Sequence, residues 1–129
     1  MRTLIVEDDF TNRLLLQNLL APYGECHVAV NGREAVEAFR LALTRGRGYD
    51  LICMDITLPE LDGHQAVQEL RRLEKAVGTR DNRATIIVTT ASNDGADVGM
   101  AQKEGCNGYL LKPLDGRRLK GLLRARGLI

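Results

Sequence analysis

Short apolar runs alternate with longer amphipathic segments along the chain. The runs are rich in leucine, isoleucine and valine, and they cover residues 3–6, 26–30, 51–54, 85–89 and 108–111. Near-continuous apolar runs of this length are typical of strands that are buried on both faces. The pattern therefore predicts five strands of a sheet that helices cover on both sides.

Apolar residues at helical spacing occupy the stretches between these runs. The expected helices cover about residues 11–20, 33–43, 63–77, 94–104 and 115–126. The fourth has the weakest pattern, because Gly95 and Gly99 lower helix propensity. Five strand–helix units in succession predict one α/β domain over residues 1–129, and right-handed crossovers make its parallel sheet doubly wound.

Composition and charge narrow the class of protein. A length of 129 residues, with 44% apolar and 27% charged residues, is ordinary for a soluble domain. The formal charge of +1 is too small to attract nucleic acid or an anionic membrane to the chain as a whole, so neither is expected as a direct partner. The first residues show no signal-peptide pattern and no run is long enough to span a bilayer, which favours a cytoplasmic location. Cys26, Cys53 and Cys106 are expected to be reduced thiols.

Polar residues stand where the predicted strands end. Ligands of a doubly wound sheet bind at the carboxyl ends of its strands. The residues at these ends are Glu7, Asp8 and Asp9 after the first run, Asp55 after the third, Thr90 after the fourth and Lys112 after the fifth. Carboxylates about 5 Å apart repel by roughly 3 kcal/mol at an effective dielectric near 20, so a hard cation is expected to bind there.

Magnesium fits this oxygen-rich set best, because it accepts carboxylate ligands, keeps several waters and commonly bridges to phosphate. With a cation and a lysine beside it, Asp55 can act as a nucleophile toward phosphorus. Lys112 would stabilise the negative charge that spreads over the transferring group, and Thr90 would donate a hydrogen bond to one of its oxygens. The chemistry predicted is phosphorylation of an aspartate.

Four stretches make the interpretation more specific. LIVEDDFTNRLLL, LICMDITLPELDGHQAV, TIIVTTAS and GCNGYLLKPL follow one another along the chain. In this order they resemble the response regulator receiver family, and the resemblance covers essentially the whole sequence. It implies a flavodoxin-like (CheY-like) fold with strand order 2-1-3-4-5 and five flanking helices. It also implies a cis peptide between Lys112 and Pro113.

The resemblance also implies ligands for Mg²⁺. Glu7 and Asp8 match the family's acidic pair, in a register set by Arg13; Asp8 would contact the metal directly and Glu7 through water. Asp55 matches the phosphoacceptor and a metal ligand, and the backbone carbonyl of Thr57 matches the third protein ligand.

Further residues match the family's switch. Thr90 matches the switch hydroxyl, Tyr109 the switch aromatic and Lys112 the lysine of the site. Thr57 and Ser92 stand at positions that tune the lifetime of the phosphoryl group, and neither offers an amide or carboxylate to orient water. Slow self-dephosphorylation is therefore expected.

The family implies a signalling role and not a turnover enzyme. A sensor histidine kinase or a histidine phosphotransfer protein would present phosphohistidine to Asp55. The new charge would then remodel the face formed by the fourth helix, fifth strand and fifth helix for a downstream partner. A monomer or weak homodimer is expected, and either a stand-alone regulator or part of a longer chain fits the sequence.

Two other classes of protein share parts of this pattern. A phosphatase of the haloacid dehalogenase type also uses an aspartyl nucleophile, but it needs a second aspartate where Thr57 stands. A receiver-like module that is never phosphorylated would lack a site residue, and none is missing. The segment Arg45–Gly48 (RGRG) superficially resembles a phosphate-binding loop, but it follows a helix and precedes a strand, which is the wrong context.

Overall fold

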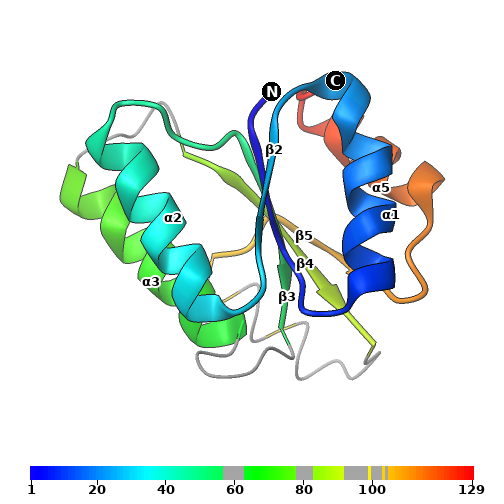
Figure 1. Ribbon diagram of the computed structural model, residues 1–129, viewed down its shortest axis with the longest axis horizontal. Coiled ribbons are helices and arrows are strands. Elements are labelled where there is room, and N and C mark those ends of the chain that lie inside the picture. The colour runs from blue at the N-terminus through cyan, green and yellow to red at the C-terminus, as the bar shows by residue number, and fades with distance from the viewer. Residues whose placement is uncertain (57–62, 78–82, 92–98, 100–102, 104) are drawn as a thin grey trace.

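A computed structural model describes residues 1–56, 63–77, 83–91, 99, 103 and 105–129. It contains a five-stranded parallel sheet in the order β2-β1-β3-β4-β5, with helices on both faces (Figure 1). The strands are β1 (Thr3–Val6), β2 (Cys26–Ala29), β3 (Leu51–Asp55), β4 (Thr85–Thr90) and β5 (Gly108–Leu111). The predicted doubly wound sheet and its strand order are confirmed.

Four α-helices lie within the described residues. They are α1 (Phe10–Leu20), α2 (Gly32–Thr44), α3 (Gly63–Val77) and α5 (Gly116–Ala125), and a 3₁₀ turn (Ala21–Tyr23) follows α1. The helix predicted over residues 94–104 lies almost wholly outside the described residues; the two residues described there, Gly99 and Lys103, are helical. Within the described part of the chain, no helix combines the length and apolar character needed to span a membrane.

Alternating side chains of the strands build two cores. Leu4 and Val6 of β1 point toward α2 and α3, where they pack with Phe39 and Leu70. Ile5 points to the other face and belongs to the core that α1 and α5 cover. Figure 1 shows these two helices together on that side of the sheet. This alternation explains the near-continuous apolar runs, because a strand covered on both faces buries every side chain.

The strand register assembles the site at one edge of the sheet. Val6 of β1 pairs with Met54 of β3, so the acidic residues that follow β1 lie beside the end of β3. Asp55 pairs with Thr89 of β4. Asp9 is the N-cap of α1, where its Oδ2 accepts a hydrogen bond from Asn12 N at 2.9 Å. Asp9 therefore has a structural role outside the acidic pair, as the sequence register predicts.

Candidate functional site

Three carboxylates converge at the carboxyl edge of the sheet. One ligand oxygen from each of Glu7, Asp8 and Asp55 lies within 4.8 Å of the others. Glu7 and Asp55 are 0% and 1% exposed, whereas Asp8 is exposed and opens the cluster to solvent. A hard cation that keeps part of its water shell fits such a half-open, all-oxygen set.

The charge state of Glu7 supports this fit. Burial and the neighbouring Asp55 carboxyl raise the pKa of Glu7 to about 7, and the Lys112 ammonium lowers it by less than Asp55 raises it. Three carboxylates face one ammonium here, so negative charge is in excess when Glu7 is ionised. A divalent cation bound by these oxygens would supply the missing positive charge, so the residues fit Mg²⁺.

Lys112 bridges the two buried carboxylates. Its Nζ lies 2.8 Å from Glu7 Oε1 and donates a hydrogen bond to Asp55 Oδ2 at 3.0 Å. Burial lowers the pKa of Lys112, but Glu7 and Asp55 together raise it above its ordinary value, so the ammonium stays charged. The backbone N–H of Lys112 donates to the carbonyl of Thr90 at 2.7 Å, and the peptide bond to Pro113 is cis, as the resemblance implies.

The other predicted residues divide into three groups. Thr90 is buried at the end of β4, one residue beyond the partner of Asp55, and belongs to the same edge. Tyr109 lies within β5 opposite Val88 and is 38% exposed, so it stands apart from the carboxylate cluster. The predictions for Thr57 and Ser92 lie outside the described residues.

Two supporting residues were not assigned to the site from the sequence. A Cβ added to Gly63 would lie 2.4 Å from the carbonyl oxygen of Asp55 and 2.3 Å from Ile56 Cα. The start of α3 therefore rests directly on the backbone of the predicted phosphoacceptor, and only glycine permits this approach. Arg13 Nη1 donates to the carbonyl of Glu7 at 3.3 Å. The Asp62-Gly63 dipeptide signals a turn, but a turn signal does not reveal which backbone the glycine will meet.

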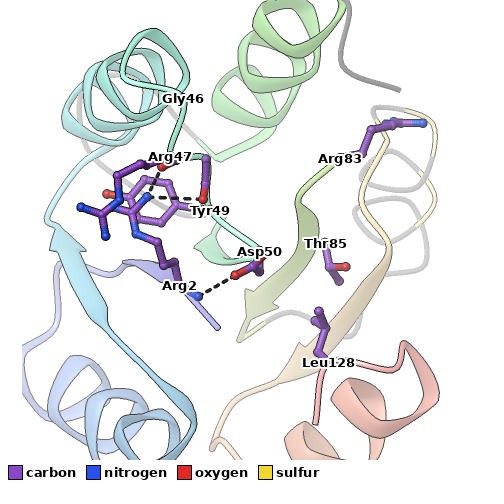
Figure 2. A pocket seen from close by; sticks show the side chains of 9 residues that line it. Arg2, Gly46, Arg47, Tyr49, Asp50, Arg83, Thr85 and Leu128 are labelled. Carbon is purple, nitrogen blue, oxygen red and sulfur yellow. Dashed lines mark hydrogen bonds between the residues drawn. The ribbon is translucent and has the colours of Figure 1, made fainter. Parts of the chain in front are cut away.

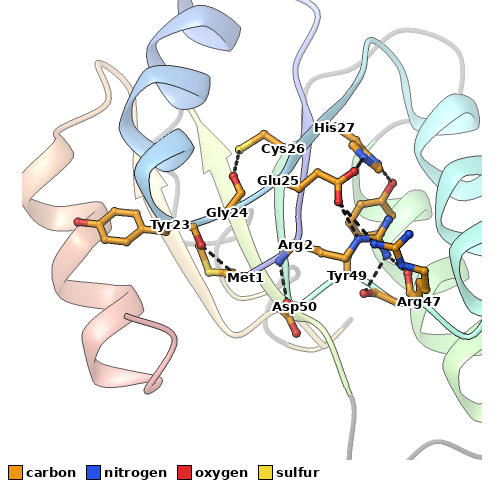
Figure 3. Close-up of polar contacts among 11 residues, drawn as sticks. Met1, Arg2, Tyr23, Gly24, Glu25, Cys26, His27, Arg47, Tyr49 and Asp50 are labelled. Carbon is orange, nitrogen blue, oxygen red and sulfur yellow. Dashed lines mark hydrogen bonds and ion pairs between the residues drawn. The ribbon is translucent and has the colours of Figure 1, made fainter.

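A cavity of about 420 Å³ lies at the opposite edge of the sheet, where the strands begin (Figure 2). Arg2 Nη1 donates to the carbonyls of Arg47 and Gly48, and its guanidinium lies 5.0 Å from the centre of the Tyr49 ring. Figure 3 shows the same arginine beside Glu25, with Nε 3.5 Å from Oε2. Carbonyl oxygens, not N–H groups, thus face Arg2 from the Arg45–Gly48 segment.

Comparison with known proteins gives the family. The sequence model of the response regulator receiver domain matches residues 3–124. The chain is 34% identical to the chemotaxis protein CheY of Thermotoga maritima, over 92% of this chain and 90% of that protein. It is 35% identical to hybrid signal transduction histidine kinase G of Dictyostelium discoideum, of which it spans only 4%.

Solved structures agree with these relatives. The receiver domain of a Pseudomonas aeruginosa sensor histidine kinase, with a magnesium ion in its active-site cleft, is 32% identical at a TM-score of 0.76, covering 98% of this chain and 97% of that one. The receiver domain of Ssk1 of Saccharomyces cerevisiae, in complex with the histidine phosphotransfer protein Ypd1, is 36% identical at a TM-score of 0.78, covering 93% and 83%. By sequence and by fold, the chain belongs to the response regulator receiver family.

Proposed function

We propose that this receiver accepts a phosphoryl group on Asp55 from a phosphohistidine partner, with Mg²⁺ bound at the carboxylate cluster. The observation that carries the proposal is the placement of the Asp55 carboxylate. It is 1% exposed, lies beside two further carboxylates and accepts a hydrogen bond from Lys112 Nζ at 3.0 Å. A buried aspartate between a cation site and an ammonium group has the surroundings that phosphoryl transfer requires.

The transfer moves one phosphoryl group between two nucleophiles. An oxygen of Asp55 forms a bond to phosphorus while the bond from phosphorus to the donor's imidazole nitrogen breaks, and that bond's electron pair stays on nitrogen. Mg²⁺, when held by Glu7, Asp8, Asp55 and the carbonyl of Thr57, would neutralise charge on the phosphoryl oxygens. Lys112 already contacts the acceptor carboxylate, so its ammonium would follow the charge onto the phosphoryl group.

The partner is a sensor histidine kinase or a histidine phosphotransfer protein. Support comes from the Ssk1 receiver, which is described in complex with such a phosphotransfer protein, and from the hybrid histidine kinase among the relatives. The chain acts as a signalling acceptor in the cytoplasm and performs no turnover chemistry on a separate substrate.

Phosphorylation shifts the receiver between two states. Thr90 lies at the end of β4 and would donate its hydroxyl to the new phosphoryl group. Tyr109, 38% exposed in the present state, would then turn inward. The surface of β5 and α5, together with the segment before β5, would change for a downstream partner.

Acetyl phosphate with Mg²⁺ tests the proposal. Intact-mass spectrometry should detect one added phosphoryl group on the wild-type chain and none on Asp55→Asn. Asp50→Asn is the matched control, because Asp50 precedes the same strand at the opposite edge and should not affect phosphorylation. An excess of EDTA should prevent the modification.

Three outcomes would contradict the proposal in different ways. Phosphorylation of Asp55→Asn would place the acceptor elsewhere. Continuous release of free phosphate at enzymatic rates would support a phosphatase, and no modification at all would support a silent module. Loss of the phosphoryl group within seconds would contradict the slow self-dephosphorylation expected from Thr57 and Ser92.

A further inference from the structure

Positive charge is concentrated at the carboxyl-terminal end of the chain. Residues 115–129 carry five basic side chains and one acidic one, a net +4. Residues 1–114 carry thirteen basic and sixteen acidic side chains, a net −3. The overall charge of +1 is therefore the sum of two regions of opposite sign. The five basic residues are Arg117, Arg118, Lys120, Arg124 and Arg126.

Within the described part of the chain, the basic residues of α5 have no acidic partner. Asp115 caps the helix by accepting a hydrogen bond from Arg117 N, and residues 116–129 contain no aspartate or glutamate. Within the described structure, none of the five basic side chains makes an ion pair; Arg126 alone donates a side-chain hydrogen bond, to the carbonyl of Asn107. Arg117, Arg118 and Arg124 are exposed.

The helices on the other face of the sheet differ. In α2, Arg40 pairs with Glu37 one turn away. In α3, Arg72 pairs in the same way with Glu69. The neighbouring helix α1 contains no aspartate or glutamate, and its Leu19 lies against the start of α5. Figure 1 shows α1 and α5 on the same side of the sheet. Among the described residues, acidic partners thus offset part of the basic charge of α2 and α3, whereas α5 contains no acidic residue.

Three local features of α5 oppose helix stability. Arg117 and Arg118 stand in the first turn, where the helix dipole disfavours positive charge. Arg117 and Lys120, and then Lys120 and Arg124, are like charges at repelling spacings. Gly121 lies in the middle of the helix, and a Cβ there would meet nothing within 4 Å, so neither packing nor backbone conformation requires a glycine. Departures from local stability of this kind are expected where a sequence serves binding.

We infer that the outer face of α5, around Arg117, Gly121 and Arg124, binds a short acidic helix of a protein partner. These three positions follow the spacing i, i+4, i+7 and share one face of the helix. The two arginines are about 10 Å apart along the axis, which suits carboxylates two turns apart on a partner helix. Gly121, between them, leaves room for the partner's backbone to approach.

Charge and shape favour this occupant over two others. A long nucleic acid would extend from α5 over the remainder of the chain, which carries a net charge of −3 and would repel the phosphates. An anionic membrane is bound best by large apolar side chains beside the basic ones, but the exposed positions between the cations of α5 are Gly121 and Ala125. A compact acidic segment matches the basic face alone. The inference names the chemistry of the downstream partner, and it rests on the proposed function only in taking the α5 surface as the output surface.

A designed peptide tests the inference. The probe is an alanine-based peptide of about 20 residues, long enough to be helical, with glutamates three and four residues apart along one face. Its glutamine counterpart is the control peptide. Fluorescence anisotropy with the full, unphosphorylated chain should detect binding of the glutamate peptide that weakens between about 50 and about 200 mM salt, and little binding of the glutamine peptide.

Variants of the chain separate this face from general charge effects. R117Q/R124Q should weaken binding about tenfold or more. R40Q/R72Q removes the same charge from the opposite face and should leave binding unchanged. Gly121→Gln should raise the melting temperature, because it replaces a glycine that destabilises the helix. It should nevertheless weaken peptide binding, because the new side chain occupies the space that the peptide backbone would enter.

Several results would overturn the inference. The inference fails if the glutamate and glutamine peptides bind equally, or if R117Q/R124Q and R40Q/R72Q lose the same affinity for the glutamate peptide. It also fails if Gly121→Gln binds that peptide as tightly as the wild type does. Tighter binding to a DNA duplex of about 20 base pairs, or to vesicles of phosphatidylcholine and phosphatidylserine, would assign the face to those ligands instead. Asp55→Asn should bind the peptide as the wild type does, so failure here is distinguishable from failure of phosphorylation.

Discussion

Arg71 of α3 joins three parts of the fold through one side chain, and its removal should be severely destabilising. Its guanidinium donates to the carbonyl of Gly105 at 3.0 Å, to that of Ala84 at 2.9 Å and to Asn107 Oδ1 at 2.8 Å. It also pairs with Glu74 Oε1 at 2.7 Å, and the two side chains are only 10% and 4% exposed. The segment before β5 and the start of β4 are therefore both attached to α3 through this group.

The magnitude follows from what Arg71→Met leaves behind. The carboxylate of Glu74 would stay buried with the Ala84 N–H at 2.8 Å, and among the described residues only the largely exposed Arg83, at 3.8 Å, would remain as a cation. Breaking a buried ion pair on one side costs about 3–5 kcal/mol. A domain of this size has a total stability of about 5–15 kcal/mol, so the variant should lose a large share of it.

Urea unfolding followed by circular dichroism measures this loss. With an m value of about 1.5–2 kcal/mol/M, the midpoint should fall by about 2 M. Arg72→Met is the matched control: Arg72 is the next residue of the same helix, pairs with Glu69 at the same spacing and is 65% exposed, so its midpoint should not move measurably. If Arg71→Met is too unstable to study, Arg71→Lys can replace it, because lysine keeps the positive charge but lacks the several N–H donors of the guanidinium. Its urea midpoint should lie between those expected for Arg71→Met and Arg72→Met.

The double variant R71M/E74M distinguishes a buried charge from lost packing. With the carboxylate also gone, much of the stability should return, because no uncompensated charge is left inside. The reasoning is refuted if Arg71→Met costs no more than Arg72→Met. It is also refuted if the double variant is less stable than Arg71→Met alone.

Three further predictions concern the carboxylate site. Lys112→Met should slow phosphorylation by acetyl phosphate about 100-fold or more, because it removes a charged donor from the transferring group; an unchanged rate would remove Lys112 from the mechanism. The proton on Glu7, whose pKa is raised to about 7, should contribute stability that is complete below pH 4.5 and lost as the pH rises to 7. Urea midpoints in EDTA should therefore fall over this range in the wild type and stay level in Glu7→Gln. Gly63→Ala should lower stability by about 1–3 kcal/mol, because the added methyl group would collide with the backbone of Asp55. Gly121→Ala should instead raise stability by up to about 1 kcal/mol. If both variants shift the urea midpoint equally, the close contact between Gly63 and Asp55 is contradicted.

The strands and most of the helices could be predicted because their patterns are local. The runs at 3–6 and 108–111 correspond to β1 and β5 residue for residue, and the other three strands differ from their runs by one residue at the end. Parallel strands end at a common edge, so the convergence of Glu7, Asp55 and Lys112 followed from knowing where the runs ended. The position of each residue at a strand end was sufficient for that part of the site.

Contacts between distant segments could not be predicted in this way. Arg71, Glu74 and Asn107 have the composition of an ordinary polar surface, and nothing in their spacing indicates that they meet in the interior. Gly63 presents the same difficulty, because its importance depends on the backbone of Asp55 lying against the start of α3. In both cases the energetic role comes from burial, which depends on the packing of elements and not on the identity of neighbouring residues.

The overall net charge was the least informative quantity in the sequence interpretation. An overall +1 indicates that no strong field surrounds the chain as a whole, but it is an average of two different regions. One is the acidic edge, where burial and Asp55 raise the pKa of Glu7 to about 7. The other is α5, whose basic residues have no acidic partner among the described residues. Electrostatic attraction is screened beyond roughly 8–10 Å at physiological salt, so a partner responds to the patch it faces and not to the sum. The fold places the two kinds of charge on separate surfaces, because the carboxylates stand at the ends of β1 and β3 and the cations on α5. Figure 1 shows α5 beside the sheet, on the side that α1 covers. The proposed cation and the inferred acidic partner helix would therefore bind separate surfaces of this domain and would not compete for the same charge.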